Sequence, residues 1–89
     1  MKQTIIKLQN EEGIHARPAN LFSKTAMKLT CDIQVLKNGD KSKVFNPKSI
    51  ISVLSMGAIK GDELTIIANG VDEEEAIRVI TELFKNGFN

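Results

Sequence analysis

Hydrophobic side chains along this 89-residue chain follow two different periods in turn, and this alternation restricts the fold more than any other feature. In residues 3–8 every second side chain belongs to one face, as in a β-strand with one covered side; its members are Thr4, Ile6 and Leu8. After "GIHARP" the spacing changes to three and four residues, which predicts an amphipathic helix built on Pro18, Phe22, Thr25, Ala26 and Leu29. A short chain that alternates in this way must bury helices against one sheet.

The middle of the chain predicts two strands joined by a tight turn. Cys31 to Lys37 alternates again, and Asn38-Gly39 favours the positive φ angles of a hairpin. A further strand is therefore expected near Lys41 to Phe45, where Asn46-Pro47 ends it. Lysines around this hairpin are interpreted as charges that protect an edge strand, at positions 37, 41 and 43.

Three more elements complete the pattern. "SIISVLSMG" predicts a short helix with Ser49 as its N-cap and Gly57 as its stop, and Glu63 to Ala68 predicts a fourth strand. The last helix opens on Asp72 with Glu75 three residues later, which is typical of a capping box, and its expected buried stripe is Ala76, Val79, Ile80, Leu83 and Phe84. The order βαββαβα predicts an α+β fold, with a four-stranded, mainly antiparallel sheet and three helices on one face.

Composition limits the classes of function. The chain has 12 basic and 11 acidic side chains, so it offers no field of one sign to nucleic acid or to an anionic membrane. One cysteine, Cys31, and one histidine are too few for a structural metal site, and a lone cysteine excludes an internal disulfide. We expect one domain over residues 1–89 that is cytoplasmic and monomeric, with no cofactor, metal, nucleic acid or membrane insertion.

The stretch "GIHARPAN" carries the one histidine, His15, on a loop directly before the first helix. A loop histidine can be an ordinary polar surface residue, but this one has neighbours suited to phosphate. The amides at the start of a helix attract an anion, and the Arg17 guanidinium can donate charge-assisted hydrogen bonds to phosphate oxygens. A neutral imidazole is a competent nucleophile without an activating base. Glu11 and Glu12 are interpreted as solvated charges at the tip of the loop, so the pattern indicates capture and transfer of a phosphoryl group rather than hydrolysis.

Ser49 is the second candidate site. Its simplest interpretation is an N-cap worth roughly 1 kcal/mol, but the helix behind it is unusually apolar. Ile51 lies about 100° around the helix from Ile50, so either part of the apolar surface of this helix is exposed or a loop covers Ile51. An exposed patch that includes Leu54 could bind a partner, and phosphorylation of Ser49 would then place a dianion in it.

Read together, "GIHARPAN", "KSIISVLSMG" and "GDELTIIANGVDEEEAI" resemble the HPr family, the histidine-containing phosphocarriers of the bacterial phosphoenolpyruvate-dependent sugar phosphotransferase system. The resemblance covers nearly the whole chain and implies an open-faced β-sandwich. It implies that His15 accepts a phosphoryl group on Nδ1 from Enzyme I and passes it to the IIA component of a sugar permease. Arg17 and the helix start would surround the phosphate, at residues Ala16, Arg17 and Pro18.

The resemblance also implies a regulatory role for Ser49. In low-GC Gram-positive relatives this serine is modified by the HPr kinase/phosphorylase, and the product joins the regulator CcpA. Ile50, Ile51 and Leu54 fall where relatives bind partners. Compared with Gram-positive forms, residues 38–48 make a longer hairpin.

Other functions stay open at this point. A specialised relative could serve nitrogen regulation or one permease, and a purely regulatory module could act through Ser49 alone, although such modules tend to lose the histidine. A nucleic-acid-binding module of the same architecture would show salt-sensitive affinity.

Overall fold

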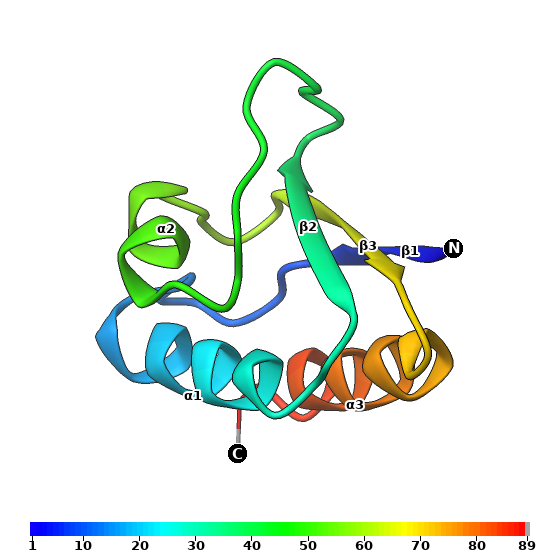
Figure 1. Ribbon diagram of the computed structural model, residues 1–89. Helices are drawn as coiled ribbons and strands as arrows, with labels where there is room; N and C mark the ends of the chain where they lie inside the picture. The colour runs from blue at the N-terminus through cyan, green and yellow to red at the C-terminus, as the bar shows by residue number, and fades with distance from the viewer. Residues whose placement is uncertain (89) are drawn as a thin grey trace.

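The computed structural model describes residues 1–88, which form three strands and three helices (Figure 1). In chain order these are β1 (Lys2–Lys7), α1 (Ala16–Met27), β2 (Asp32–Lys37), α2 (Ile50–Ser55), β3 (Glu63–Asn69) and α3 (Glu73–Lys85). All three predicted helices are present, and three of the four predicted strands are present.

The strands form one antiparallel sheet in the order β1-β3-β2. β3 is central, with Leu64 opposite Ile6 of β1 and Ile66 opposite Val35 of β2. Alternate side chains of a strand point to opposite faces, so one face of β3 carries Leu64, Ile66 and Ala68, and all three are fully buried as predicted.

Helices α1 and α3 lie side by side along one face of the sheet, and α2 packs against α1 at one end (Figure 1). The two long helices meet through Phe22 and Phe84, whose rings are 5.0 Å apart and edge to face, a favourable aromatic geometry. No helix of the described residues has the length and apolar character needed to cross a membrane. The core that joins sheet and helices includes Leu8, Ile14, Phe22, Ala26, Val35, Val53, Ile66, Ile80 and Phe84.

The strand predicted near Lys41 to Phe45 is wrong. Asn38 and Gly39 do have positive φ angles, 53° and 73°, so the turn forms as the sequence indicates. A two-residue turn there would set Ser42 opposite Val35, but Phe45 takes that place through a single antiparallel bridge. Asp40 instead accepts hydrogen bonds from the amide and hydroxyl of Ser42, at 2.9 and 2.6 Å, and turns the chain outward. The segment projects from the sheet as the long loop at the top of Figure 1.

The predicted capping box at α3 is also wrong. Asp72 is the N-cap, and its carbonyl accepts from Ala76 at 2.9 Å, but its side chain makes no hydrogen bond to its own helix. Its two carboxylate oxygens accept from the amides of Thr30 and Cys31, each at 2.8 Å, and so tie α3 to the α1–β2 connection. The Thr30 amide is the main cause that lowers the pKa of Asp72 to about 2 from an ordinary 3.8. Glu75, the expected partner in the box, pairs with Arg78.

Candidate functional site

The connection between β1 and α1 is a short turn held by backbone hydrogen bonds and by one hydrogen bond from a side chain. Gly13 donates to the carbonyl of Asn10 at 3.1 Å, and the Asn10 side chain donates back to the Gly13 carbonyl at 2.5 Å. Gly13 has φ +66°, and a Cβ there would lie 2.5 Å from the carbonyl oxygen of Ala58, so glycine is required on both counts. Ile14 then donates to the same Ala58 oxygen at 3.1 Å. The residue before His15 is therefore fixed to the segment that follows α2.

His15 is the N-cap of α1, with extended backbone angles of φ −103° and ψ −161°. Its carbonyl accepts the first helical hydrogen bond, from Ala19 at 2.8 Å, but its side chain makes no capping hydrogen bond. The imidazole is 46% exposed and Nε2 lies 2.9 Å from Oε2 of Glu12. The ring is thus accessible, and none of its bonding capacity is used in starting the helix.

The first turn of α1 supplies the surroundings that the sequence predicts for a phosphate. Ala16 and Arg17 occupy its first two positions, where backbone N–H groups have no partner inside the helix, and both residues are exposed. Pro18 is third, is buried and has no N–H to donate. Pro18 therefore fixes the first turn against the core, and the donors available to an anion belong to Ala16 and Arg17.

Glu11 and Glu12 are exposed at the tip of the loop, as interpreted, but each also contacts another side chain, which the sequence did not predict. Oε2 of Glu12 contacts Nε2 of His15 as described, and Glu11 pairs with Lys60, with Oε1 and Nζ 2.6 Å apart. The hydrogen bond from Lys60 lowers the pKa of Glu11. The spacing of three residues between Glu12 and His15 is a weak signal for their contact, because it brings side chains together only when the intervening turn is known.

Ser49 is the N-cap of α2, as predicted. Its Oγ accepts from the amide of Ser52 at 3.3 Å, and the Ser52 hydroxyl in turn accepts from the amide of Asn46 at 2.9 Å. Ser49 is partly exposed. Its hydroxyl lies at the start of a helix that contacts α1.

Apolar side chains of α2 are exposed, so the alternative that a loop covers Ile51 is wrong. Ile51 is 76% exposed, and Ile50 and Leu54 are also exposed, while Val53 of the same helix is fully buried. The sequence does not identify a further exposed apolar residue, Ile59, which is 65% exposed and whose Cα would lie 3.0 Å from a Cβ at Gly13. Ile59 lies in a loop, where the spacing of hydrophobic residues carries no signal. Only its approach to the turn before His15 singles it out.

Cys31 lies in the core, as predicted. Its side chain is 2% exposed, and burial is the main cause that raises the pKa of its thiol to about 11. A thiol that stays protonated at neutral pH is not a nucleophile.

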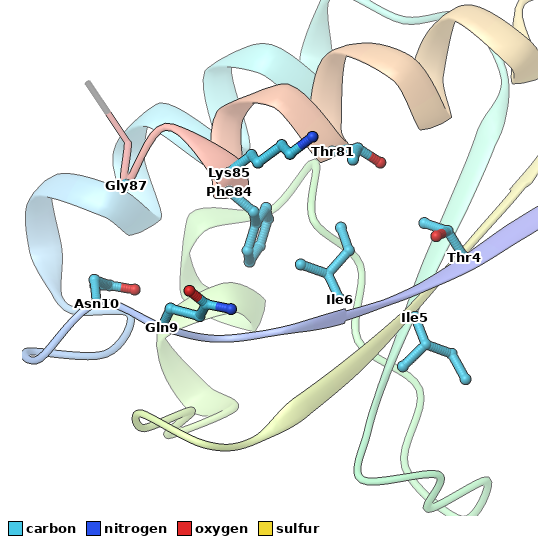
Figure 2. A pocket seen from close by; sticks show the side chains of 9 residues that line it. All are labelled: Thr4, Ile5, Ile6, Gln9, Asn10, Thr81, Phe84, Lys85 and Gly87. Atoms are coloured by element: carbon cyan, nitrogen blue, oxygen red, sulfur yellow. The ribbon is translucent and has the colours of Figure 1, made fainter.

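A separate hollow of about 360 Å³ lies between β1 and the C-terminal half of α3 (Figure 2). Phe84 points into it from α3, and Ile6 faces Phe84 from β1. Lys85 is the one charged side chain in its lining, which contains no histidine, cysteine or carboxylate. None of the sequence-predicted site residues lines this hollow. Among residues 1–88 no cluster of three or more histidine, cysteine, aspartate or glutamate side chains could hold a metal ion.

Comparison with known proteins identifies the family of this chain. The family model described as "PTS HPr component phosphorylation site" matches residues 2–86. An HPr of Thermoanaerobacter tengcongensis is 40% identical, with a TM-score of 0.90 over 99% of this chain and 96% of that chain. The histidine-containing phosphocarrier protein of a Mycoplasma is 32% identical, with a TM-score of 0.88 over 98% of this chain and 96% of that chain.

A third relative is described as a dimer. Crh of Bacillus subtilis is 34% identical, with a TM-score of 0.70 over 99% of this chain and 97% of that chain, and it is described as a domain-swapped dimer. That the present chain is a monomer therefore stays a prediction. The match over nearly the whole chain, the fold and the exposed histidine at the start of α1 agree on one conclusion: the chain belongs to the HPr family of phosphocarriers of the phosphotransferase system.

Proposed function

We propose that His15 is the phosphoryl acceptor, that Enzyme I is its donor and that the IIA components of sugar permeases receive the group from it. The observation that carries this proposal is the state of the imidazole. It is exposed at the start of α1, and its side chain takes no part in capping that helix. A nucleophile that the fold does not need can be modified and restored in every cycle without disturbing the helix.

Arg17 is proposed as the phosphate ligand. A phosphoryl group on His15 would lie near the N–H groups of Ala16 and Arg17, where the helix dipole adds a partial positive charge. The guanidinium of Arg17 is exposed and could add charge-assisted hydrogen bonds. These groups are donors only, and they neutralise the phosphoryl charge without activating water.

Ile50, Ile51 and Leu54 are proposed as the docking surface for these partners. All three are exposed on α2, and the hydrogen bond between Ile14 and Ala58 connects the end of the α2 region to the His15 turn. A carrier has to release each partner after transfer, and a small apolar contact of this kind favours fast dissociation. The free cysteine supports a reducing cytoplasm as the place of this exchange.

Ser49 is proposed as a regulatory phosphorylation site for an HPr kinase/phosphorylase, with CcpA as a partner of the product. Its partly exposed hydroxyl lies in the residue directly before exposed Ile50 and Ile51. Phosphate there would add about −1.5 to −2 charge beside an apolar surface, and it would change which partners bind.

Transfer of label tests the acceptor. Incubation with labelled phosphoenolpyruvate and Enzyme I should label the wild type, and His15→Ala should take up none. Arg17→Ala should keep the acceptor but lower the initial rate of labelling. Persistent labelling of the His15→Ala protein would refute the assignment.

The regulatory site needs a second assay, with ATP and the kinase. Ser49→Ala should lose the label, whereas Ser55→Ala is a matched control because Ser55 is an exposed hydroxyl of the same helix. Equal labelling of wild type and Ser49→Ala would reject Ser49.

A further inference from the structure

Glu12 and His15 form a contact that the family resemblance does not predict. Oε2 of Glu12 lies 2.9 Å from Nε2 of His15, a distance at which a ring N–H donates to a carboxylate. The contact leaves the second ring nitrogen, Nδ1, outside both this bond and the helix cap. The two nitrogens of His15 are therefore in different environments before any partner arrives.

The turn that carries Glu12 is fixed on both sides. Asn10 and Gly13 close it by two hydrogen bonds, and Ile14 is bonded to Ala58. Glu11 pairs with Lys60. Glu12 therefore lies at one position in a turn of defined geometry, although its side chain is 76% exposed.

We propose that Glu12 is a positioning residue for phosphoryl transfer: by accepting the Nε2–H of His15 it orients the ring and keeps Nδ1 unprotonated, as the nucleophile. In neutral imidazole one nitrogen carries the proton and the other the lone pair, and the hydrogen bond made by one nitrogen selects the tautomer. A carboxylate accepts and cannot donate, so at Nε2 it favours the protonated form of that nitrogen. The proposal rests on the proposed function, in which His15 is the acceptor.

With Nδ1 unprotonated, the phosphoryl transfer requires no movement of a proton. The lone pair on Nδ1 forms the new N–P bond, and the P–N bond of the donor phosphohistidine breaks with its electron pair returning to the donor imidazole. Nε2 keeps its hydrogen, so the phosphorylated ring carries a positive charge next to the Glu12 carboxylate. Transfer onward reverses these changes, and Nδ1 recovers its lone pair.

The same geometry keeps Glu12 from acting as a hydrolytic base. A general base must lie within hydrogen-bond reach of the proton that it removes, directly or through one water. The Glu12 carboxylate lies next to Nε2, whereas the phosphoryl group would be on Nδ1, which faces another direction in the ring plane. A carboxylate three residues from the acceptor is thus compatible with a stable phosphohistidine.

Nitrogen-15 NMR of the free protein tests the tautomer directly, at about pH 9 where imidazole is neutral. The chemical shifts of the two ring nitrogens report which one is protonated. Wild type should show mainly the Nε2–H form, and Glu12→Ala should increase the Nδ1–H fraction. Glu11→Ala is the matched control, because it removes the same charge from the same turn but breaks the Lys60 pair, and it should keep the wild-type ratio. A wild-type ratio in Glu12→Ala, or an equal change in both variants, would overturn the proposal.

The rate of labelling from Enzyme I supplies the functional readout. We expect Glu12→Ala to lower the initial rate about two- to fivefold, the scale of an exposed charged pair, and Glu11→Ala to leave it unchanged. An unchanged rate in Glu12→Ala would overturn the positioning role. These results are separable from the acceptor assignment, because the tautomer ratio needs no phosphoryl donor and His15→Ala tests the acceptor by itself.

Discussion

The first and second helices of this chain begin with similar backbone geometry and use their N-cap side chains differently. His15 and Ser49 both precede their helices in extended conformation, with φ −103° and −109°. The Ser49 hydroxyl accepts from the amide of Ser52, whereas the His15 imidazole makes no bond to its helix. One N-cap side chain is part of the fold, and the other is available for chemistry.

The difference has a structural cause in what precedes each helix. The start of α1 is fixed by the left-handed Gly13 and by the bond between Ile14 and Ala58, which are backbone features. The start of α2 depends on side chains, since Ser49 and Ser52 both accept amide hydrogens there. A reactive residue can be exchanged without loss of stability only where the backbone already holds the turn.

Gly13→Ala should break the first of these helix starts, and it is the largest effect that we expect on the free energy of unfolding. A left-handed alanine costs roughly 1–2 kcal/mol, and the 2.5 Å approach to the Ala58 oxygen adds to that cost. Denaturant unfolding followed by circular dichroism measures it. Gly39→Ala is the control, because Gly39 has φ +73° with no atom near a Cβ, so it should lose less. Equal losses of unfolding free energy in the two variants would show that the close approach to Ala58 adds nothing to the cost of Gly13→Ala.

Asp72→Asn extends the comparison to the third helix start, where the N-cap side chain binds another element. The native state lowers the pKa of Asp72 to about 2 from 3.8, so its ionised form stabilises the fold. This contribution is complete above the ordinary value and is lost as the pH falls from about 5 towards 2. We expect the variant to be less stable at neutral pH, with a gap that narrows over this range. Parallel curves of stability against pH would contradict the assignment.

Ser49→Ala should destabilise the second helix start by roughly 1 kcal/mol, because the Ser52 amide loses its acceptor. Thermal and denaturant unfolding both report this change. The control is Ser55→Ala, which removes a hydroxyl that donates to the Ser52 carbonyl near the end of the same short helix, and its loss should be smaller. If Ser49→Ala were neutral, the two helix starts would not differ as described.

His15→Ala should have the smallest effect on stability, within about 0.5 kcal/mol, since the side chain is partly exposed and caps nothing. The same substitution should abolish phosphoryl transfer. A stability loss as large as that of Ser49→Ala would mean that the imidazole supports the fold as well.

Local patterns in the sequence were sufficient for most elements and insufficient where distant segments compete. The stripe of α1 and the alternation of β3 are confirmed because one apolar face in each has only the core to bury it. In α3 the expected stripe is buried at Ala76, Ile80 and Phe84 but only partly buried at Val79 and Leu83. Lys41 to Phe45 has the turn of a hairpin, yet Phe45 reaches Val35 three residues out of the expected register. The residues after Gly39 form a local turn, in which Asp40 accepts from Ser42, instead of pairing with the edge strand. The hydrophobic pattern does not show which of these two arrangements is more stable.

The residues of the candidate site also fall into those that the sequence identifies and those that it does not. His15, Arg17 and Ser49 are identifiable because their chemistry depends on residue type and on position at a helix start. Glu12 and Ile59 are not, because their significance comes from a turn closed against Ala58 and from an approach between loops that sequence spacing does not specify. Asp72 shows the converse, since its sequence context predicts a helix cap while its carboxylate binds the α1–β2 connection.

The sequence by itself determined the three helices, three of the four predicted strands and the residues that could hold or carry a phosphoryl group, because hydrophobic period and functional-group chemistry are local properties. Only the tertiary structure decided which polar groups bond to one another. A carboxylate forms its hydrogen bonds wherever the fold brings unpaired donors within about 3 Å. For Asp72 those donors are the amides of Thr30 and Cys31, which the packing of α3 against the α1–β2 connection supplies.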